Sequence, residues 1–102
     1  MKIIWQTQAA DSYRQVAHYI SARFGRKARR EFMQRVKDAE RLIKRNPNIF
    51  PIDPLYADSP VPYRSIVING LNKLVYRVDD DVIHIVDFWD TRREPKVSQQ
   101  SL

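Results

Sequence analysis

The sequence predicts an α+β fold made of one strand, a helical hairpin and a three-stranded antiparallel meander. Residues 2–5 form a short apolar run of strand type, residues 8–45 carry apolar side chains at helical spacing, and residues 63–89 hold three runs rich in Ile and Val. With 102 residues and 43% hydrophobic content, the chain is long enough for one core and too short for two. We therefore expect a single domain over residues 1–102.

Two helices are predicted in the first half of the chain. The first runs from Gln8 to Phe24 and ends at Gly25, a residue that accepts the positive φ of a helix C-terminal cap. The second runs from Arg26 to Arg45 and ends at Asn46-Pro47. The apolar positions of the two helices, which we expect to face the core, are Tyr13, Val16, Ala17, Ile20 and Phe24, then Ala28, Phe32, Val36, Ala39 and Ile43.

The positive charge of the chain is concentrated in this hairpin. The formal net charge is +6, and residues 23–45 contain ten Lys or Arg against three acidic residues. Such a surface fits phosphates or an acidic partner. The alternative is a solvated face supported by ion pairs at helical spacing, such as Lys27–Glu31 and Glu40–Lys44.

A Pro-rich connection, residues 46–62, separates the hairpin from the meander. It holds five of the six prolines and no basic residue, so it is neither helix nor central strand. Ile49, Phe50, Ile52, Leu55 and Tyr56 give it apolar anchors, and we expect an ordered strap. The tail, residues 96–102, has little to pack with and is expected to fray.

The strands of the meander are separated by Asn69-Gly70-Leu71-Asn72 and by Asp79-Asp80-Asp81, which are typical of exposed turns. If both hairpins close symmetrically, Ile68 pairs with Lys73 and Val78 pairs with Val82. The face expected to form the core is then Tyr63, Ser65, Val67, Leu74, Tyr76, Val78, Val82, His84, Val86 and Phe88. The opposite face is Arg64, Ile66, Ile68, Lys73, Val75, Arg77, Ile83, Ile85, Asp87 and Trp89.

The second face is the candidate working surface. In this register Arg64 lies opposite Arg77, and like charges across a ladder are unfavourable unless an anion or a partner answers them. Arg92 and Arg93 follow the last strand and extend the basic rim. The same face carries several apolar residues, so we expect something to cover part of it. The alternative is an ordinary solvated face with scattered cations.

Several kinds of site are not supported by the sequence. There is no cysteine, so no disulfide or thiolate metal site forms, and the two histidines are far apart, which makes a zinc site improbable. There is no glycine-rich phosphate loop. We expect no metal and no cofactor. No run reaches the length of a membrane span and the N-terminus does not resemble a signal peptide, so we expect a cytoplasmic protein. His84 is interpreted as a structural residue.

The order and spacing of these features resemble the RelE/ParE superfamily of toxins from type II toxin–antitoxin modules. The features are the helical hairpin broken at Phe24-Gly25, the Asn46-Pro47 stop, and the NKLVYRV and IHIVDFWDTRREP segments. The resemblance covers nearly the whole chain. It implies a β-α-α-β-β-β fold with helices packed on one face of a mainly antiparallel sheet, a cytosolic location and a cognate antitoxin as partner.

Two mechanisms follow from the resemblance. RelE-like members cleave mRNA on the ribosome, and Lys73 and Arg92 match positions of their catalytic basic residues. ParE-like members inhibit DNA gyrase. Position 73 is Lys where Arg is usual, and the tail KVSQQSL lacks a C-terminal Tyr or His for proton transfer, so the sequence favours the ParE-like function.

Partner binding is assigned to Arg64, Arg77, Arg93 and Trp89 in either case. The remaining alternative is a non-toxic, basic nucleic-acid-binding module.

Overall fold

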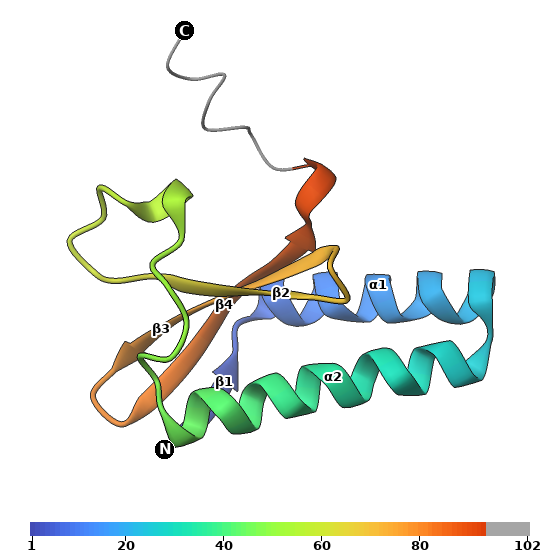
Figure 1. Ribbon diagram of the computed structural model, residues 1–102, viewed down its shortest axis with the longest axis horizontal. Helices are drawn as coiled ribbons and strands as arrows, with labels where there is room; N and C mark the ends of the chain where they lie inside the picture. The colour runs from blue at the N-terminus through green and yellow to red at the C-terminus, as the bar shows by residue number, and fades with distance from the viewer. Residues whose placement is uncertain (94–102) are drawn as a thin grey trace, which may run out of the picture.

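The computed structural model describes residues 1–93, which form a layer of two helices on one face of a four-stranded sheet (Figure 1). The elements are β1 (Lys2–Trp5), α1 (Thr7–Phe24), α2 (Arg26–Arg45), the short 3₁₀ turn η1 (Pro54–Tyr56), β2 (Arg64–Ile68), β3 (Asn72–Asp79), β4 (Val82–Asp90) and the 3₁₀ turn η2 (Thr91–Arg93). The predicted order β-α-α-β-β-β is confirmed. The expected frayed tail, residues 96–102, lies outside the described residues.

The sheet has the strand order β1-β4-β3-β2 and is mainly antiparallel, as predicted. Only β1 pairs in parallel, with Lys2 beside Val82 and Trp5 beside Ile85 on β4. A parallel neighbour requires a long crossover connection, which the helical hairpin and the meander together provide. The N-terminal strand therefore closes one edge of the sheet, while β2 forms the other edge.

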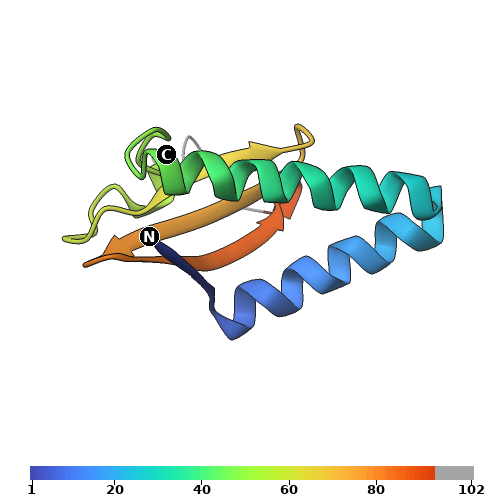
Figure 2. The same ribbon diagram turned by 90° about the horizontal axis from the view of Figure 1, so that it is seen from below.

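The core lies between the helices and one sheet face. The predicted stripe of α2 is buried at Phe32, Val36, Ala39 and Ile43. On the sheet the fully buried residues include Leu74, Tyr76, Ile83, Ile85 and Phe88. Figure 2 shows the two helices from a second direction, both on the same side of the strands. At the centre, the rings of Trp5, Tyr13, Phe32 and Phe88 form a connected aromatic cluster.

The tip of the helical hairpin extends beyond the end of the sheet (Figures 1 and 2). Gly25 joins the helices with φ 94° and ψ 176°, a conformation that is essentially restricted to glycine. The predicted positive φ of Gly25 is confirmed, but its ψ of 176° lies outside the left-handed helical region. However, Phe24 is not a core residue, because no strand lies beneath the tip, and 66% of its surface is exposed.

The predicted strand register is wrong at both turns. Ile68 pairs with Asn72 instead of Lys73, across a turn in which Asn69 and Gly70 have the expected positive φ. In the second turn Asp79 pairs with Val82, so that only Asp80 and Asp81 form the loop. Because side chains alternate with a period of two, each one-residue error moves a whole strand segment to the opposite face.

A β-bulge confines this error to part of β4. The pairing of β3 with β4 shifts by one residue between Val75 and Tyr76. As a result Ile85 and Phe88 of β4 both face the core, although they are three positions apart. The face predictions are therefore confirmed for β3 and for Asp87, Phe88 and Trp89 of β4, and they are wrong for β2 and for residues 82–85 of β4. The core prediction was wrong for Ser65, Val67 and His84, which lie on the other face, and the outer-face prediction was wrong for Ile66, Ile68, Ile83 and Ile85, which face the helices.

Candidate functional site

Part of the outer face of the sheet, around Lys73 and Val75, is covered by a segment of the chain itself, residues 46–62, which we call the strap. Tyr76 anchors its beginning, since the buried hydroxyl donates a 2.6 Å hydrogen bond to the carbonyl of Pro47. Burial raises the pKa of this phenol. Farther along, the backbone N–H of Asp53 donates to the carbonyl of Tyr63 at 2.8 Å. Val75 is fully buried although it points away from the helices, which is the expected result of this cover.

A buried ion pair fixes the strap to the sheet. The carboxylate of Asp53 is fully buried and lies 2.8 Å from the ammonium of Lys73, whose side chain is 9% exposed. The same carboxylate accepts hydrogen bonds from the Ser65 hydroxyl at 2.7 Å and from the backbone N–H of Leu55 at 2.9 Å. A buried carboxylate with three donors is a fully satisfied site, so the strap is held in one position.

The charge state of this cluster follows from its contacts. Burial alone raises the pKa of the Asp53 carboxyl, but the hydrogen bonds from Lys73, Ser65 and Leu55 outweigh burial and hold its pKa below the ordinary value of 3.8. The carboxylate in turn stabilises the ammonium form of Lys73. A charged ammonium is a hydrogen-bond donor and cannot accept a proton, so this geometry does not prepare Lys73 for proton abstraction.

The other predicted basic residues do not form one continuous surface. Arg64 pairs across the ladder with Tyr76 rather than lying opposite Arg77, and its guanidinium donates to the carbonyl of Phe50 at 2.8 Å. Arg77 pairs with His84 and forms an ion pair of 3.6 Å with Asp79. The predicted Arg64–Arg77 like-charge pair is therefore wrong, because it depended on the register of β2.

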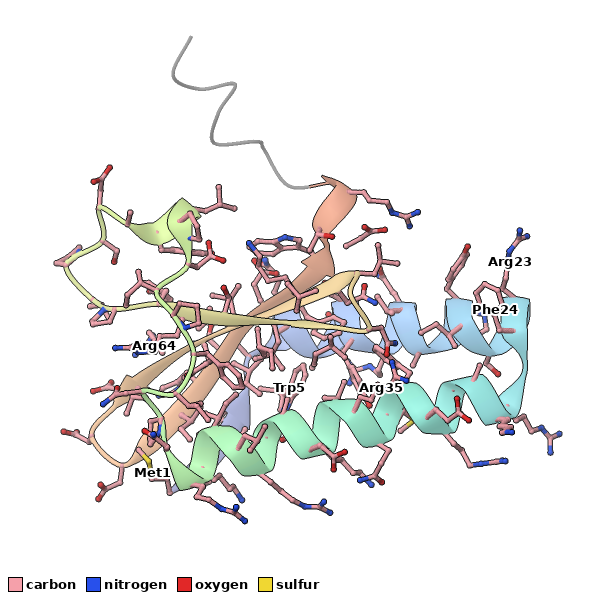
Figure 3. All side chains as sticks on the ribbon, viewed as in Figure 1. Met1, Trp5, Arg23, Phe24, Arg35 and Arg64 are labelled. Atoms are coloured by element: carbon pink, nitrogen blue, oxygen red, sulfur yellow. The ribbon has the colours of Figure 1, made fainter. Side chains whose placement is uncertain are left out.

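Figure 3 shows Arg64 at the end of the sheet far from the hairpin tip that bears Arg23 and Phe24. Lys73 lies opposite Trp89 on the neighbouring strand, and its ammonium is 5.8 Å from the centre of the indole ring. This distance permits a cation–π contact. The two residues therefore share the outer face near the end of β4.

At the end of β4, Arg92 is exposed and its guanidinium lies 2.6 Å from the carboxylate of Asp90. Their hydrogen bonds raise the pKa of Arg92 above its ordinary value. Arg93 follows in η2, so its backbone continues from this end of the sheet. The arrangement thus leaves Arg92 accessible at the same end of the molecule as Trp89, whereas Lys73 is buried beneath the strap.

A groove of about 610 Å³ opens between the hairpin and this end of the sheet. Its walls include Val16, Tyr19, Ile20 and Phe24 of α1 and Leu71, Trp89 and Arg92 from the sheet end. Tyr19 and Phe24 are 57% and 66% exposed. On the α2 side, Arg35 donates a hydrogen bond to the side-chain oxygen of Asn69, which ties the helix to the first turn of the meander. The groove is thus lined by apolar side chains together with charged residues of both signs, Arg35 and Arg92 beside Glu31 and Asp90.

The chain matches the family model described as "ParE toxin of type II toxin-antitoxin system, parDE" over residues 3–95. It belongs to the ParE toxin family. A solved structure of a chromosomal ParDE toxin–antitoxin system from P. aeruginosa has the same fold, with a TM-score of 0.69, 15% identity, and coverage of 88% of this chain and 95% of that one. The YoeB dimer from Staphylococcus aureus also matches, with a TM-score of 0.61, 24% identity, and coverage of 85% and 92%. No curated protein sequence gives a significant match.

The predicted RelE/ParE resemblance is therefore confirmed, and the ParE-family chain is a toxin of the type II toxin–antitoxin class. The candidate residues that sequence reasoning missed are Asp53 and the groove pair Tyr19 and Phe24. A signal for Asp53 was present, because Asp before Pro followed by a turn is typical of a side chain that caps the turn, as the Leu55 contact shows. For Tyr19 and Phe24 the helical spacing alone gave no sign that the sheet ends before the hairpin does.

Within residues 1–93 the structure contains no cluster of three or more His, Asp or Glu side chains that could hold a metal ion. None of the helices described has the length and apolar character required to cross a membrane.

Proposed function

We propose that the ParE-family chain arrests bacterial growth by binding DNA gyrase, and that a cognate antitoxin neutralises it, as in modules that stabilise plasmids. The gyrase target is inferred from the family match, which covers residues 3–95. Gyrase is a cytoplasmic enzyme, so the proposed action places the toxin in the cytoplasm.

The burial of Lys73 is the observation that favours binding over RNA cleavage. A charge stabiliser has to contact the reacting phosphate, and the position of Lys73 beneath the strap and 2.8 Å from Asp53 prevents this contact. Arg92 is accessible, but a single arginine paired with Asp90 provides neither a general base nor a general acid. The described residues therefore support a surface that binds a target better than one that cleaves RNA.

RNA cleavage is the second candidate function, and the exposure of Arg92 at the end of β4 is the observation in its favour. Cleavage would require the strap to move away from Lys73. It would also require a proton-transfer group, for which the tail KVSQQSL offers no Tyr or His.

We propose the groove between the hairpin and the sheet end as the antitoxin site. Exposed aromatic residues such as Tyr19 and Phe24 are energetically favourable anchors for a partner when a segment covers them. The charged residues of the groove, Arg35 and Arg92 together with Glu31 and Asp90, favour a segment that carries polar residues of both signs beside its apolar ones. An amphipathic helix or an extended strand of the antitoxin fits this description.

The growth experiment tests the toxin assignment. Induction of this chain alone should stop growth, and co-expression of the antitoxin encoded beside its gene should restore growth. Normal growth at verified soluble expression would instead favour a non-toxic nucleic-acid-binding module.

The target is tested by labelling in the minutes after induction. A pulse of labelled thymidine should show an early loss of DNA synthesis, while incorporation of a labelled amino acid continues. Immediate loss of amino-acid incorporation with continuing DNA synthesis would refute gyrase as the target.

Two variants add a second test of the target. For an RNA-cleaving enzyme, Arg92→Ala and Lys73→Ala should each lower the cleavage rate by about 10²–10³. For gyrase binding, Arg92→Ala should leave most of the toxicity. Circular dichroism of each variant serves as the control for correct folding, because Arg92 also lines the proposed antitoxin groove.

A further inference from the structure

The outward side of α2 carries a continuous row of cations that neither the core nor the groove uses. With about 100° between successive helix residues, seven Lys and Arg fall within an arc of about 100° opposite the buried stripe. We call this row the cationic stripe, and its residues are Arg26, Lys27, Arg30, Lys37, Arg41, Lys44 and Arg45, all exposed. In Figure 3, nitrogen-tipped side chains follow the edge of α2 that is turned away from the sheet.

The stripe is not neutralised within the part of the chain that the structure describes. Helical spacing would allow ion pairs such as Lys27–Glu31, but among residues 1–93 only Arg41 of the stripe forms one, with Asp38 at 3.1 Å. Several stripe residues also lie three or four positions apart, which places like charges side by side on the helix. The ion-pair explanation of this basic helix therefore accounts for one of its seven outward cations.

The N-terminal part of the stripe opposes the stability of the helix, whereas Lys44 and Arg45 in the last turn favour it. The first turn of α2 contains no acidic residue, although the N-terminal end of a helix favours negative charge. Instead, Arg26 and Lys27 occupy this turn. An arrangement that disfavours the isolated helix at its N-terminus and along its length is explained by an external anion that compensates the charge.

We propose that the cationic stripe binds the phosphate backbone of a nucleic-acid double helix. This inference goes beyond the proposed function, because the stripe faces away from the groove and from the outer sheet face. From Arg26 to Arg45 the stripe spans about 29 Å at 1.5 Å per residue, which is close to one turn of a duplex, about 34 Å. A row of this length can lie against several phosphates at once.

The composition of the stripe selects among anionic partners. Interfaces with folded proteins concentrate their binding energy in buried aromatic and apolar anchors, and the stripe contains neither. Single-stranded nucleic acids are bound by stacking bases on aromatic side chains, which the stripe also lacks. Lys and Arg side chains without aromatic neighbours fit the regular phosphates of a duplex and carry no sequence specificity.

The test measures binding of the full chain to a fluorescently labelled 24-base-pair DNA duplex of arbitrary sequence, by anisotropy between about 50 and 200 mM salt. The variant Arg30→Gln/Lys37→Gln removes two neighbouring stripe charges. The matched control, Lys2→Gln/Arg14→Gln, removes two exposed charges from β1 and α1. Circular dichroism confirms that each variant is folded.

We expect the slope of log affinity against log salt to fall by about 2 in magnitude for the stripe variant and to change little for the control. A duplex RNA of the same length, measured in parallel, distinguishes the two sources of phosphate backbone, and stripe-dependent binding of either supports the proposal. Equal weakening by both double variants would overturn it, because net charge alone would then explain binding. Tighter binding of polyglutamate or of single-stranded DNA than of either duplex would also overturn it. These outcomes are independent of growth arrest, which tests the proposed function.

Discussion

Removing Asp53 should destabilise the protein more than removing Lys73, although the two residues form one ion pair. In Asp53→Ala, the Lys73 ammonium stays buried without its carboxylate, and the Ser65 hydroxyl and the Leu55 N–H lose their acceptor. Removing one member of a buried pair typically costs about 3–5 kcal/mol. Because domains of this size have stabilities of about 5–15 kcal/mol, Asp53→Ala should remove a large fraction of the free energy of unfolding.

Lys73→Met should cost less. The methionine fills a similar volume, and Asp53 keeps the hydrogen bonds from Ser65 and Leu55. We expect a loss of about 1–3 kcal/mol, the range for a hydrogen bond to a charged group. The double variant Asp53→Ala/Lys73→Met should then be more stable than Asp53→Ala alone, because it no longer buries a charge without its partner.

The assay is urea unfolding followed by circular dichroism for the four proteins of this cycle. With a urea m value of about 2 kcal/mol/M, a loss of 4 kcal/mol lowers the midpoint by about 2 M. If Asp53→Ala costs less than about 1 kcal/mol, or if the double variant is less stable than both single variants, the ion pair does not fix the strap. The position of Lys73 would then no longer exclude its contact with RNA.

Three further predictions follow from other residues. Because the folded-state pKa of Asp53 lies below 3.8, the stability that its carboxylate contributes is complete above that pH and is lost as the pH falls toward the folded-state pKa. The difference in unfolding free energy between wild type and Asp53→Asn should therefore narrow below about pH 4. A difference that stays constant with pH would contradict the lowered pKa of Asp53. Gly25→Ala should lower the free energy of unfolding by about 1–3 kcal/mol in thermal unfolding, and by more than Gly70→Ala does. An added Cβ meets no heavy atom within 4 Å at either position, so only the backbone conformation distinguishes the two sites. Equal losses would show that the backbone conformation of Gly25 is no more strained for alanine than that of Gly70. Trp89→Ala should weaken the antitoxin complex by about 2 kcal/mol, or about 30-fold, in calorimetry, whereas Ile52→Ala, an exposed residue outside the groove, should not; equal effects would remove Trp89 from the interface.

The sequence by itself determined the elements and the family. The apolar stripe of α2, the break at Gly25 and the positive φ of Asn69 and Gly70 follow from helical periodicity and local backbone preference, so they could be predicted without tertiary information. The fold class followed from the order of these elements. The concentration of cations on the hairpin was also visible, because charge is a property of the residues alone.

Only the tertiary structure decided which face each strand segment presents. The turns after Ile68 and after Asp79 are each one residue shorter than predicted. A shift of one residue in the pairing exchanges the two faces of an entire strand. The bulge between Val75 and Tyr76 then reverses the exchange partway along β4. No local signal in the Ile- and Val-rich runs specifies these shifts, because both faces carry apolar residues.

The site depended on contacts between distant parts of the chain. Asp53 and Lys73 are twenty positions apart, and the pairing that buries both charges exists only because the strap folds over the sheet. The groove likewise arises because the hairpin is longer than the strands on which it packs, which leaves Tyr19 and Phe24 exposed. Periodicity predicts that a residue lies on the apolar side of a helix, but whether another element covers that residue is decided by the lengths and positions of its neighbours in space.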